Sequence, residues 1–344
     1  MPKTSDPRRP SRPRLEDVAA EVGLSAASVS LVLRGAAGPS EQTRQRVLEA
    51  ATRLGYRPDR AASLLARRRS GLIGVLMDVR SDYHGELVED VHEAAERRGY
   101  DIVLSTITRT RDEQRAVETL VDSRCEALVL LGARAPAAWL TALDGQLPVV
   151  VVGRPARSAE VDVVRVADDE GIGLVVNHLV HLGHPGIAYV DGLPGPIAED
   201  RRRGYREALR RHGLENQAMV IPGGHSEEAG TRAVAALMST HPRPTAVIAF
   251  NDRVAVGLLD GLLRAGVEVP GDMSVAGYDD SPLSRLAHIG LTTVSQESHG
   301  LTEHAVAAVV ERLDGGRTGH REIVLRPRLV VRTTTATPPS TGRA

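Results

Sequence analysis

From Leu72 onwards the sequence alternates between short, nearly continuous apolar runs and amphipathic helical segments. The apolar runs of a first series are LIGVLMD, DIVLSTI, EALVLL, PVVVVG and VDVVRVAD, with helices expected near 84–98 and from Asp112. A strand that is apolar along its whole length is buried on both faces, which is typical of parallel strands covered by helices. The stretch 72–168 therefore predicts a doubly wound α/β lobe.

The same scheme is repeated in the second half of the chain. The apolar runs are GIAYVDG, TAVIAF and MSVAGYD, with a strand near 217–221 and helices expected near 199–213 and from Asp252. A chain of 344 residues is too long for one core, so two series predict two lobes. Ligands of such sheets bind at the carboxyl ends of the strands.

A different pattern precedes these lobes. Apolar residues at helical spacing, Leu15, Val18, Ala19 and Val22, are followed by Gly23, a helix stop. Ser25 is an N-cap for a second helix, and a third is expected from the N-cap Ser40 to Gly55. Three short helices with a tight turn between the first two predict a helix-turn-helix unit.

The charge of the chain is distributed unevenly. Residues 1–70 carry 14 Lys and Arg against 7 Asp and Glu, whereas the remainder carries 29 against 37, for a net charge of −1. A basic N-terminal region on an otherwise acidic chain indicates that only this region binds a polyanion. Basic segments also occur on proteins that bind no nucleic acid, so charge alone leaves both interpretations open.

Several classes of protein are not supported by the sequence. Lys3 is the only lysine, so a folded domain has no P-loop or Schiff-base lysine, and no H-E-x-x-H or G-x-S-x-G motif occurs. The single Cys125 excludes a disulfide framework and indicates a cytoplasmic protein. No apolar run approaches the roughly 20 residues of a membrane span, and the polar start MPKTSDPRRPSRP predicts no secretory signal.

Taken together and in order, these segments resemble the lactose-repressor (LacI/GalR) family of bacterial transcription regulators. The resemblance is collinear from about Arg14 to Thr333 and is strongest in LEDVAAEVGLSAASVSLVL, SEQTRQRVLEAATRLGYRPDRAA, HLVHLGHPGIAYVDG, RRRGYREAL, AFNDRVAVGLL and VPGDMSVAGYDD. It implies a multidomain fold: an all-α helix-turn-helix headpiece, a hinge helix, and a two-lobed α/β core of the type I periplasmic-binding-protein kind with doubly wound parallel sheets.

The resemblance also implies the domain boundaries. We expect a disordered arm at 1–13, the helix-turn-helix domain at 14–57, a hinge helix or linker at 58–70 and the ligand-binding core at 71–332. Lobe 1 would comprise about 71–165 and 294–324, and lobe 2 about 166–293 and 325–332, with crossings near 165, 293 and 324. The polar, low-complexity stretch TTTATPPSTGRA predicts a disordered tail at 333–344.

The second helix of a helix-turn-helix lies in the major groove. The residues expected to contact DNA are Arg14, Ser25, Ala26, Ala27, Ser28, Ser30, Arg34, Arg57, Arg60 and Leu65. Alanine offers only apolar contacts, so we expect few direct, sequence-specific contacts to bases. Leu31 stands where the family often has arginine, and Arg34 is the candidate to replace it. Leu65 occupies the position of the leucine that wedges into the minor groove, although LLARRR also fits a plain charged linker.

By position, the effector site would lie between the lobes. Its expected residues are Asp78, Tyr83, His84 and Arg154 in lobe 1, Arg201, His225, Asp252 and Asp279 in lobe 2, and Gln296 on a crossover. Asp and Arg suit sugar hydroxyls because charged groups form the stronger hydrogen bonds. A sugar, a sugar phosphate and a nucleobase all remain open as the effector.

Three histidines, His178, His181 and His184, are spaced like the ligands of a metal site. The resemblance implies instead that they lie at a helix end without metal. We therefore expect no metal or cofactor. The leading hypothesis is a cytoplasmic, homodimeric, ligand-responsive regulator, most often a repressor, that binds a palindromic DNA operator and no membrane. Its effector would control whether the hinge helices fold on DNA. The alternatives are a sugar-binding protein of a transport system and an enzyme on a doubly wound fold.

Overall fold

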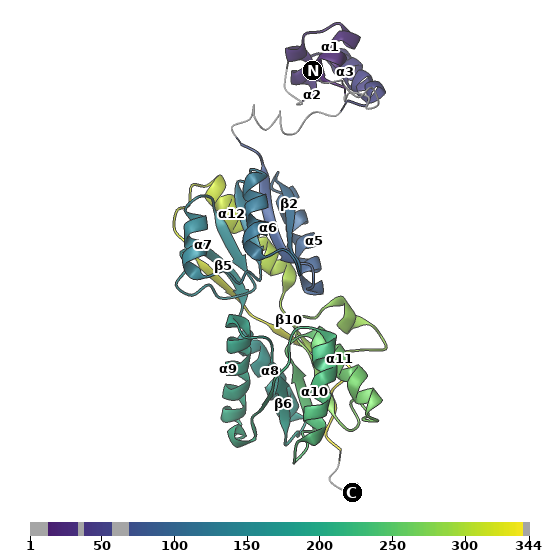
Figure 1. The fold of residues 1–344 in the computed structure, drawn as a ribbon, viewed down its shortest axis with the longest axis vertical. Coiled ribbons are helices and arrows are strands. Elements are labelled where there is room, and N and C mark those ends of the chain that lie inside the picture. The colour runs from purple at the N-terminus through teal and green to yellow at the C-terminus, as the bar shows by residue number, and fades with distance from the viewer. Residues whose placement is uncertain (1–12, 34–37, 57–68, 340–344) are drawn as a thin grey trace, which may run out of the picture. The chain divides into compact units, whose positions relative to one another are not determined.

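The structure, a computed structural model, describes residues 13–33, 38–56 and 69–339. It divides into two compact units, residues 1–70 and 71–344 (Figure 1). Arg34, Arg57, Arg60 and Leu65 lie outside the described residues, as do nearly all of the expected arm and hinge. None of the described helices is long and apolar enough to cross a membrane.

The first unit contains three helices: α1 (Leu15–Val22), α2 (Ala26–Leu33) and α3 (Glu41–Leu54). Val18, Val29 and Val47, one from each helix, are fully buried in a shared core. Gly23 ends α1 in the left-handed conformation, with φ +65°, which glycine adopts without strain. The oxygen of Ser40 accepts the Thr43 N–H at 3.3 Å and caps α3. The predicted helices are confirmed.

The first lobe of the second unit contains a six-stranded parallel sheet in the order β11-β5-β4-β3-β1-β2. Its strands are β1 (Leu72–Asp78), β2 (Asp101–Ile107), β3 (Ala127–Leu131), β4 (Val149–Val152), β5 (Asp162–Val166) and β11 (Glu322–Leu325). Its helices are α5 (Asp82–Glu96), α6 (Glu113–Asp122), α7 (Ala137–Asp144) and α12 (Ser298–Leu313). Val75 packs under α5 and α12, and the next residue, Leu76, packs under α6 and α7. Both faces are therefore buried, as the continuous apolar runs predict.

The second lobe repeats this scheme around a four-stranded parallel sheet in the order β7-β6-β8-β9. Its strands are β6 (Ile187–Val190), β7 (Met219–Ile221), β8 (Ala246–Ala249) and β9 (Ser274–Ala276). Helices α8 (Asp168–His181) and α9 (Pro196–Arg211) cover one face, and α10 (Glu227–Ser239) and α11 (Asp252–Arg264) cover the other. The predicted pair of doubly wound lobes is confirmed.

Three segments join the lobes. They lie between β5 and α8, between β10 (Thr293–Ser295) and α12, and between β11 and β12 (Arg328–Val330). Strands β10 and β12 pair antiparallel, so two of the crossing segments run side by side (Figure 1).

The expectation of a disordered tail from residue 333 is wrong for residues 333–339. Val275 N–H donates to the Thr334 carbonyl at 2.8 Å, beside β9, which is an edge strand of its sheet. The rings of His178 and His184 lie within 3.0 Å of Thr335 Oγ1 and 2.9 Å of the Ala336 carbonyl. Polar composition suggested disorder, but these groups satisfy a sheet edge and two imidazoles.

Candidate functional site

The carboxyl ends of the strands in both lobes carry most of the residues expected to bind ligand. Ion pairs join the two lobes around them. Arg157 of lobe 1 lies 2.8 Å from the Asp200 carboxylate, and Arg285 of lobe 2 lies 3.6 Å from Glu86. The guanidinium of Arg253 donates to the Arg80 carbonyl. The two lobes are therefore in direct contact.

Arg201, on α9, is the most constrained of these residues. Its side chain is nearly fully buried, its Nε donates to Asp168 at 2.7 Å and its Nη1 to the Phe250 carbonyl at 2.5 Å. Its guanidinium carbon lies 3.5 Å from the ring centre of Tyr278 and 4.7 Å from that of Phe250. A planar guanidinium suits such stacking and leaves its edge for hydrogen bonds. Its charge is thus held in one orientation.

Asp279 follows β9 and lies beside Arg201, with the closest nitrogen–oxygen distance at 3.8 Å. It receives a hydrogen bond from Gln296 Nε2 at 2.7 Å, and its φ of +118° is unusual for a residue other than glycine. Burial raises the pKa of Asp279 to about 8; Arg201 opposes this shift, and the neighbouring Asp252 adds to it. Burial thus favours the protonated form of the Asp279 carboxyl, and a protonated carboxyl can donate a hydrogen bond.

Asp252, at the start of α11, supports the site. One carboxylate oxygen accepts the Ser281 N–H at 2.7 Å, and the other accepts the Thr293 hydroxyl at 2.5 Å. Burial raises its pKa to about 6, although these two hydrogen bonds oppose the shift. Asp252 ties the loop after β9 to β10, and both of its oxygens are occupied within lobe 2.

Tyr83, on α5 of lobe 1, lies near the carboxyl group of Asp279. Its side chain is buried, and its hydroxyl has no hydrogen-bond partner in the described part of the chain. Burial raises its pKa well above the usual value; the neighbouring Asp279 adds to this shift, and Arg201 opposes it. An unpaired buried hydroxyl is unfavourable without a partner. Tyr83 is therefore a candidate to hydrogen-bond a ligand.

Asp78 and His84 form a second group, at the end of β1. The Asp78 carboxylate accepts hydrogen bonds from Arg80 Nε at 2.9 Å and Nη2 at 2.7 Å. Burial would raise the pKa of Asp78, but the hydrogen bonds from Arg80 hold it below its usual value. His84 Nδ1 accepts the Asp78 backbone N–H at 3.1 Å. Burial lowers the pKa of His84 to about 4, so the ring is neutral.

His225 follows β7 in lobe 2. Its ring stacks on Phe250 with centroids 4.7 Å apart and planes 7° apart, and its Nε2 accepts the Leu193 N–H at 3.3 Å. Burial, and then the charge of Arg134, lowers the pKa of His225 to about 4. Because Arg201 also packs on Phe250, His225 and Arg201 are joined through one ring.

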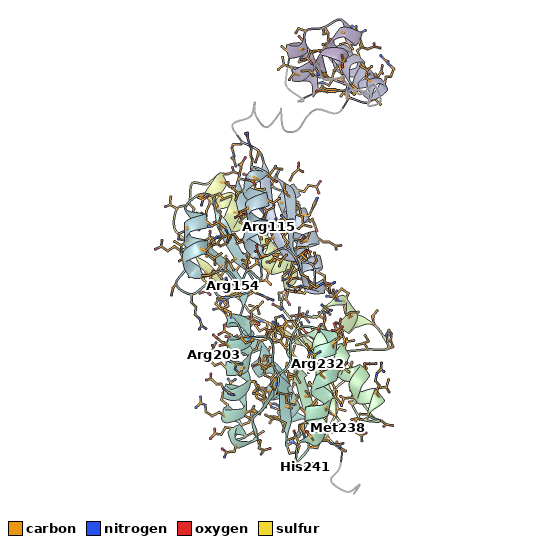
Figure 2. The ribbon with its side chains drawn as sticks, viewed as in Figure 1. Arg115, Arg154, Arg203, Arg232, Met238 and His241 are labelled. Atoms are coloured by element: carbon orange, nitrogen blue, oxygen red, sulfur yellow. The ribbon has the colours of Figure 1, made fainter. Side chains whose placement is uncertain are left out.

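Arg154, after β4, lies at the end of the first lobe that faces the second (Figure 2). Its Nη1 donates to the Pro155 carbonyl at 3.0 Å and its Nη2 to the Ala135 carbonyl at 3.1 Å. Its Nε is buried without a partner among the described residues, and burial lowers its pKa. The structure places Arg154 against backbone carbonyls rather than in contact with the Arg201 group.

The structure thus brings Tyr83, Arg201, Asp279 and Gln296 together and links His225 to them, with Asp252 as a support. Sequence reasoning missed Asp168, Phe250 and Tyr278. Each follows the carboxyl end of a parallel strand, β5, β8 or β9. The rule that ligands bind at these ends could have indicated all three.

In the first unit, the residues expected to read DNA lie along α2. Ser25 Oγ accepts the Ser28 N–H at 3.1 Å and lies 2.9 Å from the Ser28 hydroxyl. Ser25 therefore caps α2 as expected. Its side chain also lies within hydrogen-bond distance of the Ser28 hydroxyl, which we expect to contact bases. Ala27 and Leu31 are exposed, whereas Ala26 and Ser30 are half-buried.

Arg14 precedes α1 and is exposed, and its backbone N–H donates to Asp17 at 2.6 Å. Arg46 on α3 donates to the Val22 carbonyl at 2.9 Å and so ties α3 to the end of α1. The unit leaves the small, apolar Ala27 and Leu31 as the outward face of α2.

Two family profiles match the chain. One, described as bacterial regulatory proteins of the lacI family, matches residues 14–59, and the other, a periplasmic binding protein-like domain, matches residues 176–335. The first covers the three-helix unit, and the second covers most of the second lobe together with α12 and β11 of the first lobe.

The chain is similar to known proteins over nearly its whole length. It is 32% identical to the HTH-type transcriptional regulator GalR of Salmonella typhimurium, over 95% of this chain and 97% of that one. A crystal structure of the lac repressor dimer bound to operator and the anti-inducer ONPF has a TM-score of 0.82 at 28% identity, covering 95% and 100% of the two chains. A complex of the transcriptional regulator CelR with cellobiose has a TM-score of 0.70 at 28% identity, covering 94% and 100%.

Proposed function

The chain belongs to the lacI family of bacterial regulatory proteins, and we propose that it is a repressor whose effector, a sugar or sugar derivative, binds between the lobes. It is a DNA-binding transcriptional regulator. Arg201 is the residue on which the effector site is centred, with Asp279, Gln296 and Tyr83 around it.

The arrangement of Arg201 carries this proposal. Its guanidinium is buried at the carboxyl ends of the lobe 2 strands, stacked on Tyr278 and hydrogen-bonded to Asp168. Near it are the buried hydroxyl of Tyr83, which has no partner among the described residues, and the carboxyl of Asp279, whose pKa is raised by burial. Hydroxyl groups of a sugar both donate and accept hydrogen bonds, so they complement this mixture. The relative CelR, solved with cellobiose, supports a sugar-type effector.

The DNA complex would be that of a homodimer on a palindromic operator. The similar lac repressor was solved as a dimer on its operator, and two-fold symmetry of the protein requires two matching half-sites. Leu65 would act as the minor-groove wedge, with phosphates held by Arg14, Arg57 and Arg60. Few direct contacts to bases would come from the remaining expected residues, Ala26, Ala27, Ser28 and Ser30.

The protein would act in the cytoplasm, without catalysing a reaction. The relatives are named as transcriptional regulators. A transport function for the core is disfavoured because the helix-turn-helix unit precedes it.

Footprinting of the purified chain on its own upstream region, with and without a panel of sugars, tests the proposal. We expect a protected palindrome of about 14–20 base pairs, which one sugar or sugar derivative releases. Absence of specific protection under every condition would contradict a repressor that binds an operator. Protection that no small molecule alters would contradict the effector site.

A further inference from the structure

One arginine near the interlobe site has no acidic partner among the residues that the structure describes. Arg134 follows β3, in the loop Gly132–Pro136, and is exposed. Its side chain forms no hydrogen bond or ion pair with the described residues, since Glu113 accepts only the backbone N–H of Arg134 at 2.8 Å. Arg154 likewise lacks a carboxylate partner and donates only to backbone carbonyls among the described residues, but two other arginines of the site differ in this respect. Arg80 is paired with Asp78 at 2.7 Å, and Arg201 with Asp168 at 2.7 Å.

The charge of Arg134 acts on two histidines, one from each lobe. This charge disfavours the protonation of both His84 and His225, lowering the pKa of each. A Cβ atom on Gly132, two residues before Arg134, would lie 3.1 Å from His84 Nε2. The loop that carries Arg134 therefore packs against His84, and the charge of the same arginine reaches His225 of lobe 2.

The hydrogen bonds of the two rings determine their tautomers. His84 accepts a backbone N–H at Nδ1, so the neutral ring carries its proton on Nε2. His225 accepts a backbone N–H at Nε2, so its proton is on Nδ1. Neither of these N–H groups has a partner in the described part of the chain. Both rings thus present a donor rather than an acceptor.

The charges around His225 are unbalanced. Those that act on its ring are the guanidinium groups of Arg134, Arg201 and Arg80 and a single carboxylate, that of Asp78. Asp168 pairs with Arg201 at 2.7 Å, and Asp78 pairs with Arg80 at 2.7 Å. Of these three guanidinium groups, only that of Arg134 lacks a carboxylate partner in the described part of the chain.

From these contacts we infer that the effector carries an anionic group, a phosphate or a carboxylate, bound by Arg134 together with the N–H groups of His84 and His225. The inference rests on the proposed effector site and narrows its ligand from sugars in general to phosphorylated or acidic sugars. Phosphate and carboxylate oxygens accept several hydrogen bonds at once, and a charge-assisted bond to arginine is about twice as strong as a neutral one.

Isothermal titration calorimetry on the full chain tests the inference. The ligands are glucose 6-phosphate against glucose, ribose 5-phosphate against ribose, glucuronate and gluconate as carboxylates, and inorganic phosphate as the anion alone. Arg134→Gln is compared with Arg115→Gln, an exposed arginine on α6 of the same lobe (Figure 2). Both sites are exposed, so both variants should fold, which circular dichroism checks.

We expect at least one anionic sugar to bind about tenfold or more tightly than its neutral parent. Arg134→Gln should abolish that difference while preserving the affinity for the neutral parent, and Arg115→Gln should preserve both. The phosphate and carboxylate arms identify which anion is preferred. Binding of neutral sugars alone, unaffected by Arg134→Gln, would overturn the inference, as would the failure of every anionic ligand and of phosphate to bind.

The operator footprint distinguishes failure of the inference about an anionic effector from failure of the proposed function. An operator that is released by a neutral sugar would leave the proposed function intact and overturn the anionic effector. An absent footprint would contradict the repressor proposal, while the titrations would still decide whether the anion binds.

Discussion

Arg201 donates its Nε–H to Asp168 across 2.7 Å, and this bond joins α9 to the start of α8 between two side chains that are almost completely buried. Removing one partner from a buried ion pair leaves an uncompensated charge, whereas exposed pairs contribute little. The same bond fixes the orientation of the guanidinium that we place in the effector site. Stability and ligand response are therefore linked at this residue.

Arg201→Ala should abolish the response of operator binding to the effector and lower the free energy of unfolding by about 3–5 kcal/mol. Urea unfolding and footprinting measure the two effects. Arg210→Ala on the same helix, whose exposed side chain pairs only with Glu207 at 3.4 Å, is the matched control and should change stability by less than about 1 kcal/mol. A normal response in Arg201→Ala would refute the site assignment.

Asp279 should make the protein less stable as the pH rises. Its pKa is raised to about 8 in the folded protein, whereas an unfolded Asp titrates near 4. Between these values only the folded state holds the proton, so stability is fully present below about pH 4 and falls up to about pH 8. Asp279→Asn should flatten this dependence, measured as the urea midpoint at each pH.

The exposed Asp260→Asn, at a carboxylate that pairs with Arg264 at 2.9 Å, controls for the loss of one carboxylate elsewhere. An unchanged pH profile in Asp279→Asn would mean that the Asp279 carboxyl is ionised at neutral pH.

His184 should stabilise the segment 333–339. Its ring lies 2.9 Å from both Thr245 Oγ1 and the Ala336 carbonyl, and burial lowers its pKa. His184→Ala should lower the free energy of unfolding by about 1–3 kcal/mol because the Ala336 carbonyl loses its donor. The exposed His181→Ala is the control, and hydrogen exchange of the Ala336 amide reports whether the segment is released.

The His184 contribution has the opposite pH dependence to that of Asp279. Because the folded ring resists protonation, stability is lost as the pH falls below about 6.5, the usual pKa of histidine. The difference in unfolding free energy between the parent chain and His184→Ala should shrink in that direction. A constant difference from pH 5 to pH 8 would contradict a neutral, hydrogen-bonded ring.

Leu65→Ala should weaken specific operator binding far more than non-specific DNA binding, because only the specific complex uses an apolar wedge. Electrophoretic mobility shifts on operator and on random duplex measure both affinities. Ser40→Ala, which removes a helix cap in the same unit, should cost about 1 kcal/mol of stability and leave the ratio of the two affinities unchanged. Equal losses on both duplexes in Leu65→Ala would contradict the wedge.

The helices, strands and caps could be predicted from the sequence because they depend on neighbours a few residues apart. The stop at Gly23, the caps at Ser25 and Ser40, and strands such as β1 at Leu72–Asp78 all follow from apolar spacing and local hydrogen bonding. The lobes followed as well, since continuous apolar strands must be covered on both faces.

The pairing of the polar groups was decided only by the tertiary structure. Arg201 meets Asp168, 33 residues away, and Asp252, expected to bind ligand, directs both carboxylate oxygens to Ser281 and Thr293. The segment after residue 333 has the composition of a disordered tail, yet it pairs with the edge of β9. A buried polar group takes whichever partner the packed backbone brings within hydrogen-bond distance, and that partner follows from the fold rather than from the neighbouring sequence.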